Sequence, residues 1–185
     1  MFYSPDVYRK CTQYVVQSYE GRNLKELGFP DFIQATLVCS EAIVWMIHHP
    51  ETGKDGNLIV QCAFLNTALK KVDANYDHIR KVFGAAVACG ILALNRDESL
   101  PNDPPVRLQL IDSLRRIRNQ PKEIWMVEMA SWIVSLQPPT KSWNYRQINL
   151  LCQEAIAIHE ALKEACPFLA DRLLVKIKDY SVYLK

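Results

Sequence analysis

The chain has 185 residues, of which 49% are hydrophobic, so it is long enough to bury one sizeable core. Its 22 basic and 20 acidic side chains give a formal net charge of +2. They are spread along the sequence, without the basic block that is typical of nucleic-acid binding. We therefore expect a single domain, residues 1–185, that has no nucleic-acid partner.

The sequence also carries little sign of export or membrane insertion. Its apolar stretches are too short to cross a bilayer, and Asp6 and Arg9 stand where a signal peptide needs an apolar run. The six cysteines are widely spaced, form no Cys-x-x-Cys pair and fall mostly among apolar residues, which favours free buried thiols. These features predict a cytoplasmic protein that has no membrane partner.

Proline, glycine and capping residues divide the chain into segments of helical length, and strand-like alternation is nearly absent. Ser4, Asn75 and Ser142 are expected as helix caps, and Pro5 and Pro167 as first-turn prolines. In chain order, these signals predict about eight helices, over residues 5–20, 31–46, 58–71, 76–94, 104–118, 122–136, 143–166 and 167–180. The expected fold class is all-α, with no internal repeat.

Three blocks of the sequence resemble RelA/SpoT-type guanosine polyphosphate hydrolases, which are HD-domain phosphohydrolases. The central block, Ala63–Val72 and Tyr76–Ala88, resembles the family's A-L-L-H-D-x-x-E-D-T and, after a short turn, its E-x-x-x-x-F-G-x-x-V-A. Gly28–Val38 resembles G-x-P-Y-I-x-H-P-x-x-V, and Val127–Leu136 resembles V-K-L-A-D-K-L-x-N-L. The resemblance implies an HD-domain-like helical bundle over most of the chain.

The residues that carry the chemistry of this family differ in the present sequence. The family binds a divalent ion through His, His-Asp and Asp, but the corresponding positions here hold Gln34, Asn66, Thr67 and Ser131. Neutral oxygen donors of this kind hold a catalytic ion weakly, and without the ion no water is activated. The resemblance therefore implies a degenerate domain, a pseudoenzyme that has no metal and no cofactor.

Four neighbouring positions have changed as well. Lys70 and Lys71 stand where the family has the Glu-Asp pair that acts on the attacking water, and Trp132 and Ser135 replace a Lys and an Asn. The lysines could bind the phosphate of a nucleotide, but as helix-end cations facing water they have a simpler explanation, which we favour. Trp132 either fills the former cleft or offers a ring on which a base could stack.

Other basic residues give weaker signals. Arg22 and Lys25 lie near the basic loop that the family uses on its ligand, although such residues are more often ordinary surface charges. The densest basic cluster lies between two predicted helices and consists of Arg115, Arg116, Arg118 and Lys122. A phosphate site is conceivable there, but matching of helix dipoles explains three of the four.

The leading expectation is a catalytically inactive, regulatory HD-type domain that acts by binding. Its partner would be another protein, including a second copy, or an anionic ligand such as a guanine nucleotide or phosphate. We slightly favour a protein, because the former cleft has little convergent charge and the helix over residues 143–166 has an apolar face for an oligomer. The alternatives are a residual metal-dependent phosphohydrolase acting on (p)ppGpp or another nucleotide, and a helical structural subunit that has no ligand.

Overall fold

The computed structural model describes residues 3–18, 29–49, 53–69, 75–101 and 107–184. Over these ranges the chain forms nine α-helices and two short 3-10 helices, and it has no strand. The α-helices are α1 (Pro5–Ser18), α2 (Phe29–His48), α3 (Gly56–Ala68), α4 (Tyr76–Phe83), α5 (Ala85–Leu94), α6 (Leu108–Arg118), α7 (Lys122–Ser135), α8 (Tyr145–Leu162) and α9 (Pro167–Tyr180). The 3-10 helices are η2 (Lys163–Ala165) and η3 (Ser181–Leu184). The predicted all-α class is confirmed.

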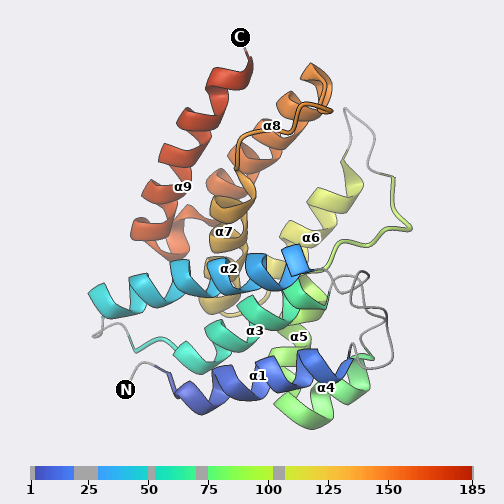
Figure 1. The fold of residues 1–185 in the computed structure, drawn as a ribbon, viewed down its shortest axis with the longest axis vertical. Helices are drawn as coiled ribbons and strands as arrows, with labels where there is room; N and C mark the ends of the chain where they lie inside the picture. Colours follow the sequence, from blue (N-terminus) through green and yellow to red (C-terminus); the bar gives the residue numbers. More distant parts are fainter. Residues whose placement is uncertain (1–2, 19–28, 50–52, 70–74, 102–106, 185) are drawn as a thin grey trace.

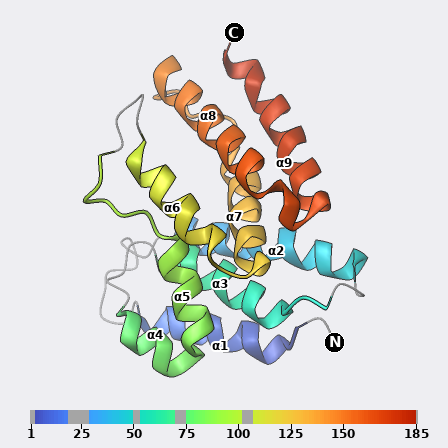
Figure 2. The ribbon, with the colours of Figure 1, turned by 180° about the vertical axis from the view of Figure 1, so that it is seen from behind.

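The helices α3 and α7 form the centre of the molecule. α3 packs against α1, α2, α5 and α7, whereas α7 packs against α2, α3, α8 and α9. In Figures 1 and 2, α1 lies below α3, and α8 and α9 run side by side toward the opposite end. Both central helices are apolar around most of their circumference, which is typical of helices that are covered on all sides.

The single helix expected over residues 76–94 is wrong, because Gly84 divides it into α4 and α5. The N–H of Gly84 donates to the Arg80 carbonyl at 2.9 Å and closes α4, and its own carbonyl accepts from the Ala88 N–H at 3.2 Å. Between these two bonds Gly84 has a φ of 94°, which residues with a Cβ rarely adopt. The break therefore depends on the glycine itself.

The beginning of α8 also differs from the expectation, because Asn144 caps this helix and Ser142 does not. The Asn144 side chain accepts from the Gln147 N–H at 3.0 Å, and the Gln147 side chain accepts from the Asn144 N–H at 2.9 Å. This reciprocal pair is a capping box, which requires Glu or Gln three residues after the cap. Ser142 has Tyr145 at that distance, so Asn144 satisfies the requirement and Ser142 does not.

The buried apolar side chains form one continuous core, to which the cysteines belong. All six cysteines are free, as predicted, and only Cys89 is more than slightly exposed. Burial raises the pKa of the Cys11 thiol to about 12, and it also raises the pKa values of Cys39 and Cys62. Such thiols stay protonated and unreactive at neutral pH. Among the described helices, none is long and apolar enough to cross a membrane.

Candidate ligand-binding cavity

A cavity of about 800 Å³ lies between α3, α5 and α7, and its volume is in the range of small-molecule sites. The α3 side of the cavity consists of Leu65, Asn66 and Leu69, the residue that follows the helix. Ile91 and Leu94 of α5 form an apolar wall. Two segments that flank helices complete the lining with Asn75 and with Asn95, Arg96 and Glu98. The cavity thus combines several apolar side chains with a larger number of polar and charged ones.

The α7 wall consists of one face of the helix. Glu128, Ser131, Trp132 and Ser135 all line the cavity, and their spacing of three and four residues places them on the same side of a helix. The Trp132 Nε1–H donates to Glu128 Oε1 at 2.9 Å, which fixes the plane of the indole ring. The Ser135 hydroxyl donates to the Ser131 carbonyl at 2.8 Å, so it is held against its own helix.

Gln34 joins this wall from α2. Its Nε2 donates to the Ser135 hydroxyl oxygen at 3.3 Å, although the two residues are 101 positions apart in the sequence. The first and the last of the three sequence blocks therefore meet in space. Gln34 lies beside the cavity, and Ser135 lines it.

Asn66 and Thr67 both belong to the buried part of α3 but face different surroundings. Asn66 is 4% exposed and lines the cavity, whereas Thr67 is 1% exposed and is not part of the lining. Asn66 Oδ1 and Thr67 Oγ1 have no hydrogen-bond partner among the described residues. Four of the residues chosen from the sequence, Asn66, Ser131, Trp132 and Ser135, thus surround one cavity, whereas Thr67 does not line it. Arg22, Lys25, Lys70 and Lys71 lie outside the described residues.

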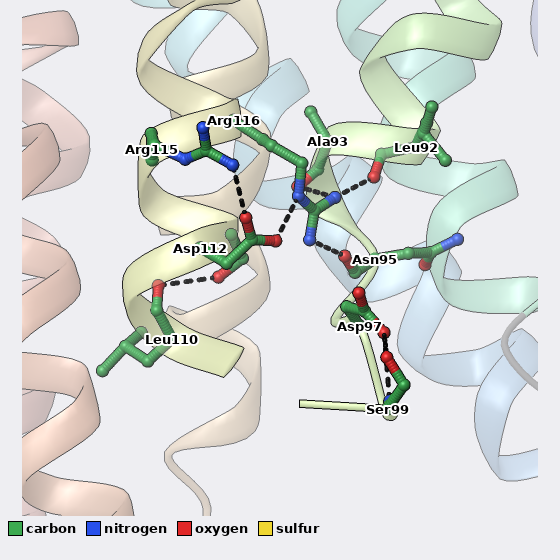
Figure 3. Close-up of polar contacts among 10 residues, drawn as sticks. Leu92, Ala93, Asn95, Asp97, Ser99, Leu110, Asp112, Arg115 and Arg116 are labelled. Atoms are coloured by element: carbon green, nitrogen blue, oxygen red, sulfur yellow. Dashed lines mark hydrogen bonds and ion pairs between the residues drawn. The ribbon is translucent and has the colours of Figure 1, made fainter. Parts of the chain in front are cut away.

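Arg116, a member of the basic cluster at the end of α6, makes its hydrogen bonds within the molecule. The Arg116 guanidinium donates to the carbonyls of Leu92, Ala93 and Asn95 at the C-terminal end of α5, and its Nε donates to Asp112 Oδ2 at 2.7 Å (Figure 3). The last carbonyls of a helix have no partner within that helix, so the arginine satisfies them. These contacts explain Arg116 without a phosphate ligand.

The same contacts hold one rim of the cavity in place. Leu94, Asn95 and Arg96 line the cavity immediately next to the carbonyls that Arg116 binds. A few residues further on, the Ser99 N–H and hydroxyl donate to Asp97 Oδ1 at 3.0 and 2.6 Å and form a turn, which Figure 3 also shows. Arg116 is therefore a structural support for the rim and does not itself line the cavity.

The charged residues of the lining were not singled out as site residues in the sequence analysis. Glu128 is 6% exposed, and Arg96 forms an ion pair with Glu154 at 3.4 Å. Glu98 is exposed. Glu128 could have been found from the sequence, because it is the only charged residue between Glu123 and Lys141. A lone acid within a buried helix usually has a specific partner or a function. Arg96 and Glu98 lie in a loop and gave no comparable signal.

The residues around the cavity do not fit the divalent ion that the resemblance implies. The Gln34 amide donates to Ser135, and Thr67 does not line the cavity. Asn66 and Ser131 line it but offer only neutral oxygens. Divalent ions are held by several carboxylates or imidazoles that converge on one point. Within the described ranges, no group of three His, Cys, Asp or Glu residues is arranged to hold a metal ion.

Comparison with known proteins identifies the fold and leaves the family open. No model of a known sequence family matches the chain, and no curated protein sequence matches it either. Its structure is similar to that of a metazoan ortholog of SpoT, which hydrolyses ppGpp and plays a role in starvation responses, with a TM-score of 0.67 at 14% sequence identity. The match covers 100% of both chains. The chain therefore has the helical-bundle fold of HD-domain hydrolases, as the sequence predicted.

Proposed function

We propose that this protein is a catalytically inactive HD-type domain that acts by binding a nucleotide-like small molecule in the cavity between α3, α5 and α7. The main observation is that neutral side chains stand at the former metal positions while the cavity itself remains formed. Asn66 and Ser131 line a space of about 800 Å³, and neither offers the charge or the imidazole that a catalytic ion needs.

The resemblance to alarmone hydrolases supports a nucleotide-like ligand. The structural neighbour acts on ppGpp, and the three resembling sequence blocks contribute residues in or beside the present cavity. An anionic ligand would need cations, which the sequence offers at Lys70 and Lys71. These two residues lie outside the described part of the chain, so the cations that the structure offers for a phosphate are few.

A formed cavity favours a small ligand over the protein partner that the sequence slightly favoured. That preference depended partly on the apolar face of α8, whose residues Cys152, Ala155, Ile158 and Leu162 are buried within the bundle. α8 packs against α6, α7 and α9, so this face already has partners inside the molecule. Regulation of an alarmone enzyme would fit a domain that binds the ligand and does not hydrolyse it.

One observation favours a second candidate, a metal-dependent phosphohydrolase that has a rebuilt site. Glu98 and Glu128 bring two carboxylates to the cavity lining, which the sequence blocks did not lead us to expect. Carboxylates bind hard cations and can act as general bases. This candidate requires that an ion binds with their help and that nucleotide hydrolysis depends on it.

Elemental analysis of protein purified without chelator, beside a thermal shift scan of guanine nucleotides with and without manganese, separates the two functions. Specific binding to the native state raises the melting temperature by mass action. We expect no stoichiometric metal and a shift that does not depend on manganese. Stoichiometric manganese, zinc or iron would contradict the proposal and favour the hydrolase.

A further inference from the structure

We infer that the solvent-facing side of α2 binds the same side of a second copy of this chain, so that the protein forms a weak antiparallel dimer about a two-fold axis near Ser40. This inference goes beyond the proposed function, since it concerns the outside of α2 and not the cavity. Three properties of α2 support it, which are its exposed apolar residues, their spacing and the charges along the helix.

The first property is that α2 is apolar on its exposed side as well as on its buried side. It packs against α3 and α7, and Ala35, Val38 and Ala42 are buried. In Figure 1 α2 crosses in front of α7, and in Figure 2 it lies behind α7, so its other side belongs to the molecular surface. The outer stripe of α2 consists of Ile33 (42% exposed), Leu37 (48%), Ser40, Val44 (38%) and Ile47 (59%). A surface helix normally has polar residues there, and an apolar stripe is typical of a side that another surface covers.

The second property is the spacing of the outer stripe, which suits a second copy of itself. Its five residues follow one another at intervals of four, three, four and three, which is the repeat of two helices packed along a common seam. The stripe is also nearly symmetric about Ser40. Leu37 and Val44 stand three and four residues from it, and the two isoleucines stand seven residues from it on either side. A two-fold interface requires such self-complementarity, and the small Ser40 side chain lets the two helices approach closely at the axis.

The third property is the charge along α2, which favours antiparallel pairing. Its only acidic or basic residues are Asp31 in the first turn, Glu41, and His48 in the last turn. Antiparallel pairing lays the acidic first turn beside the last turn of the second copy and brings opposite ends of the two helix dipoles together, whereas parallel pairing would bring like ends together. Glu41, next to the stripe, accepts hydrogen bonds from Arg172 of α9 at 2.6 and 2.7 Å, so its charge is paired within the same copy.

Sedimentation velocity of the intact protein over about 1–200 µM tests the dimer directly. A single pair of helices is a small interface beside the roughly 800 Å² per partner of a standard one, so we expect weak association with a Kd of about 10–100 µM. The mass should rise with concentration from that of a monomer toward that of a dimer and no further, because a two-fold interface closes on itself. A monomer throughout this range, or growth beyond a dimer, would overturn the inference. The proposed function would stand in either case, since it depends on ligand binding in the cavity.

Two serine variants identify the outer stripe as the contact. Ser40→Glu places two like charges against each other near the axis and should raise the Kd about tenfold or more. Ser142→Glu is the matched control, because Ser142 is also an exposed serine but lies between α7 and α8, outside the stripe. Melting temperatures check that both variants fold. An equal Kd for Ser40→Glu and Ser142→Glu would contradict the assignment of the dimer contact to α2.

Two cysteine variants test the antiparallel direction. Ile33→Cys and Ile47→Cys are mixed and oxidised in air with a copper catalyst, so that oxygen takes up the electrons of the two thiols. We expect an intermolecular disulfide in the mixture and little in either variant alone, because each new thiol then lies beside the other one and not beside its own copy. The parent protein is the control for the native cysteines, of which only Cys89 is more than slightly exposed. Disulfides in each variant alone would show parallel pairing and overturn the arrangement, and the absence of a disulfide in the mixture would overturn it as well.

Discussion

Asn66 and Asn75 line the same cavity, but only Asn75 has its side-chain oxygen satisfied. Asn75 Oδ1 accepts from the N–H groups of Asp77 and His78 at 2.9 and 3.2 Å and caps α4, whereas Asn66 Oδ1 has no hydrogen-bond partner among the described residues. The Asn66 side chain therefore contributes less to the stability of the folded protein than the Asn75 side chain does. We explain its presence by a role in binding a ligand.

We predict different stability effects for substitutions at these two asparagines. Asn75→Ala should destabilise the protein by about 1 kcal/mol, because the helix cap is lost. Asn66→Leu should be nearly neutral or stabilising, since it removes an unsatisfied polar group and keeps the branched shape of the side chain. Urea unfolding gives both values. A loss above about 2 kcal/mol for Asn66→Leu would show that the amide is satisfied in the folded protein.

Gly90 is required by close packing between α5 and its neighbours. A Cβ at this position would lie 2.6 Å from Ile124 Cδ1 and 2.9 Å from Cys62 Sγ. We predict that Gly90→Ala destabilises by about 1–3 kcal/mol, even though alanine is the better helix former. Ile124→Val removes the nearest atom, so the same substitution should be less harmful in that background. A double-mutant cycle in urea measures the difference, and perfect additivity would contradict the packing argument.

At the scale of elements, Gly84 separates α4 from α5 through its backbone conformation alone. Its φ is 94°, and a Cβ there would meet no atom within 4 Å, so a substitution would be strained without being crowded. We predict that Gly84→Ala destabilises the protein by about 1–3 kcal/mol. With a ψ of 168°, Gly84 lies in a backbone region that essentially only glycine occupies, so Gly84→Asn should be about as harmful as Gly84→Ala. Chemical denaturation checks both values, and equal stability of Gly84→Ala and the parent protein would contradict the assigned backbone strain.

Asp112 supports the rim of the cavity indirectly, because it accepts a hydrogen bond from Arg116, which binds the end of α5. Hydrogen bonds from Arg115 and Arg116 lower the pKa of Asp112 below its usual value. Folding therefore favours the carboxylate, and this stabilisation is complete above the usual pKa of aspartate and is lost as the pH falls through the lowered pKa. Since both partners lie near the surface, we expect an effect of about 1 kcal/mol or less.

We accordingly predict that Asp112→Asn is less stable than the parent protein at neutral pH and that the difference narrows as the solution becomes acidic. Urea unfolding at a series of pH values measures it. Asp171→Asn, at an exposed carboxylate of α9, is the control for a change in net charge. A difference that persists unchanged into strong acid would contradict the ion-pair explanation.

The sequence predicted the positions of most helices because their ends carry local signals. Asn75 and Pro167 mark the beginnings of α4 and α9, as expected. The break at Gly84 could not be foreseen in the same way, because a glycine within an apolar helical pattern is compatible with an unbroken helix, and only the surrounding structure sets its φ. The cap of α8 was predictable, since Gln147 has the capping-box spacing from Asn144.

At the scale of the whole molecule, the cavity is formed by elements that are distant in the sequence. The motif blocks predicted Asn66, Ser131, Trp132 and Ser135, which lie on α3 and α7 and line the cavity. The rim that contains Arg96 and Glu98 depends on Arg116 of α6, which donates hydrogen bonds to the carbonyls of Ala93 and Asn95 at the end of α5. No local sequence pattern specifies this tertiary contact. The fold and part of the cavity lining could thus be predicted, but the charge of the cavity could not.

The measurement that tests the central claim most directly is phosphate release from ppGpp and GTP by the purified protein, with added manganese and with manganese plus a chelator. If Gln34, Asn66, Thr67 and Ser131 occupy the positions of the family's metal ligands, as the resemblance implies, no ion is held and the attacking water is not activated. We predict no release above the protein-free rate under either condition. Release that requires manganese and stops with the chelator would show that Glu98, Glu128 or other residues rebuild a metal site, and it would contradict a purely binding role.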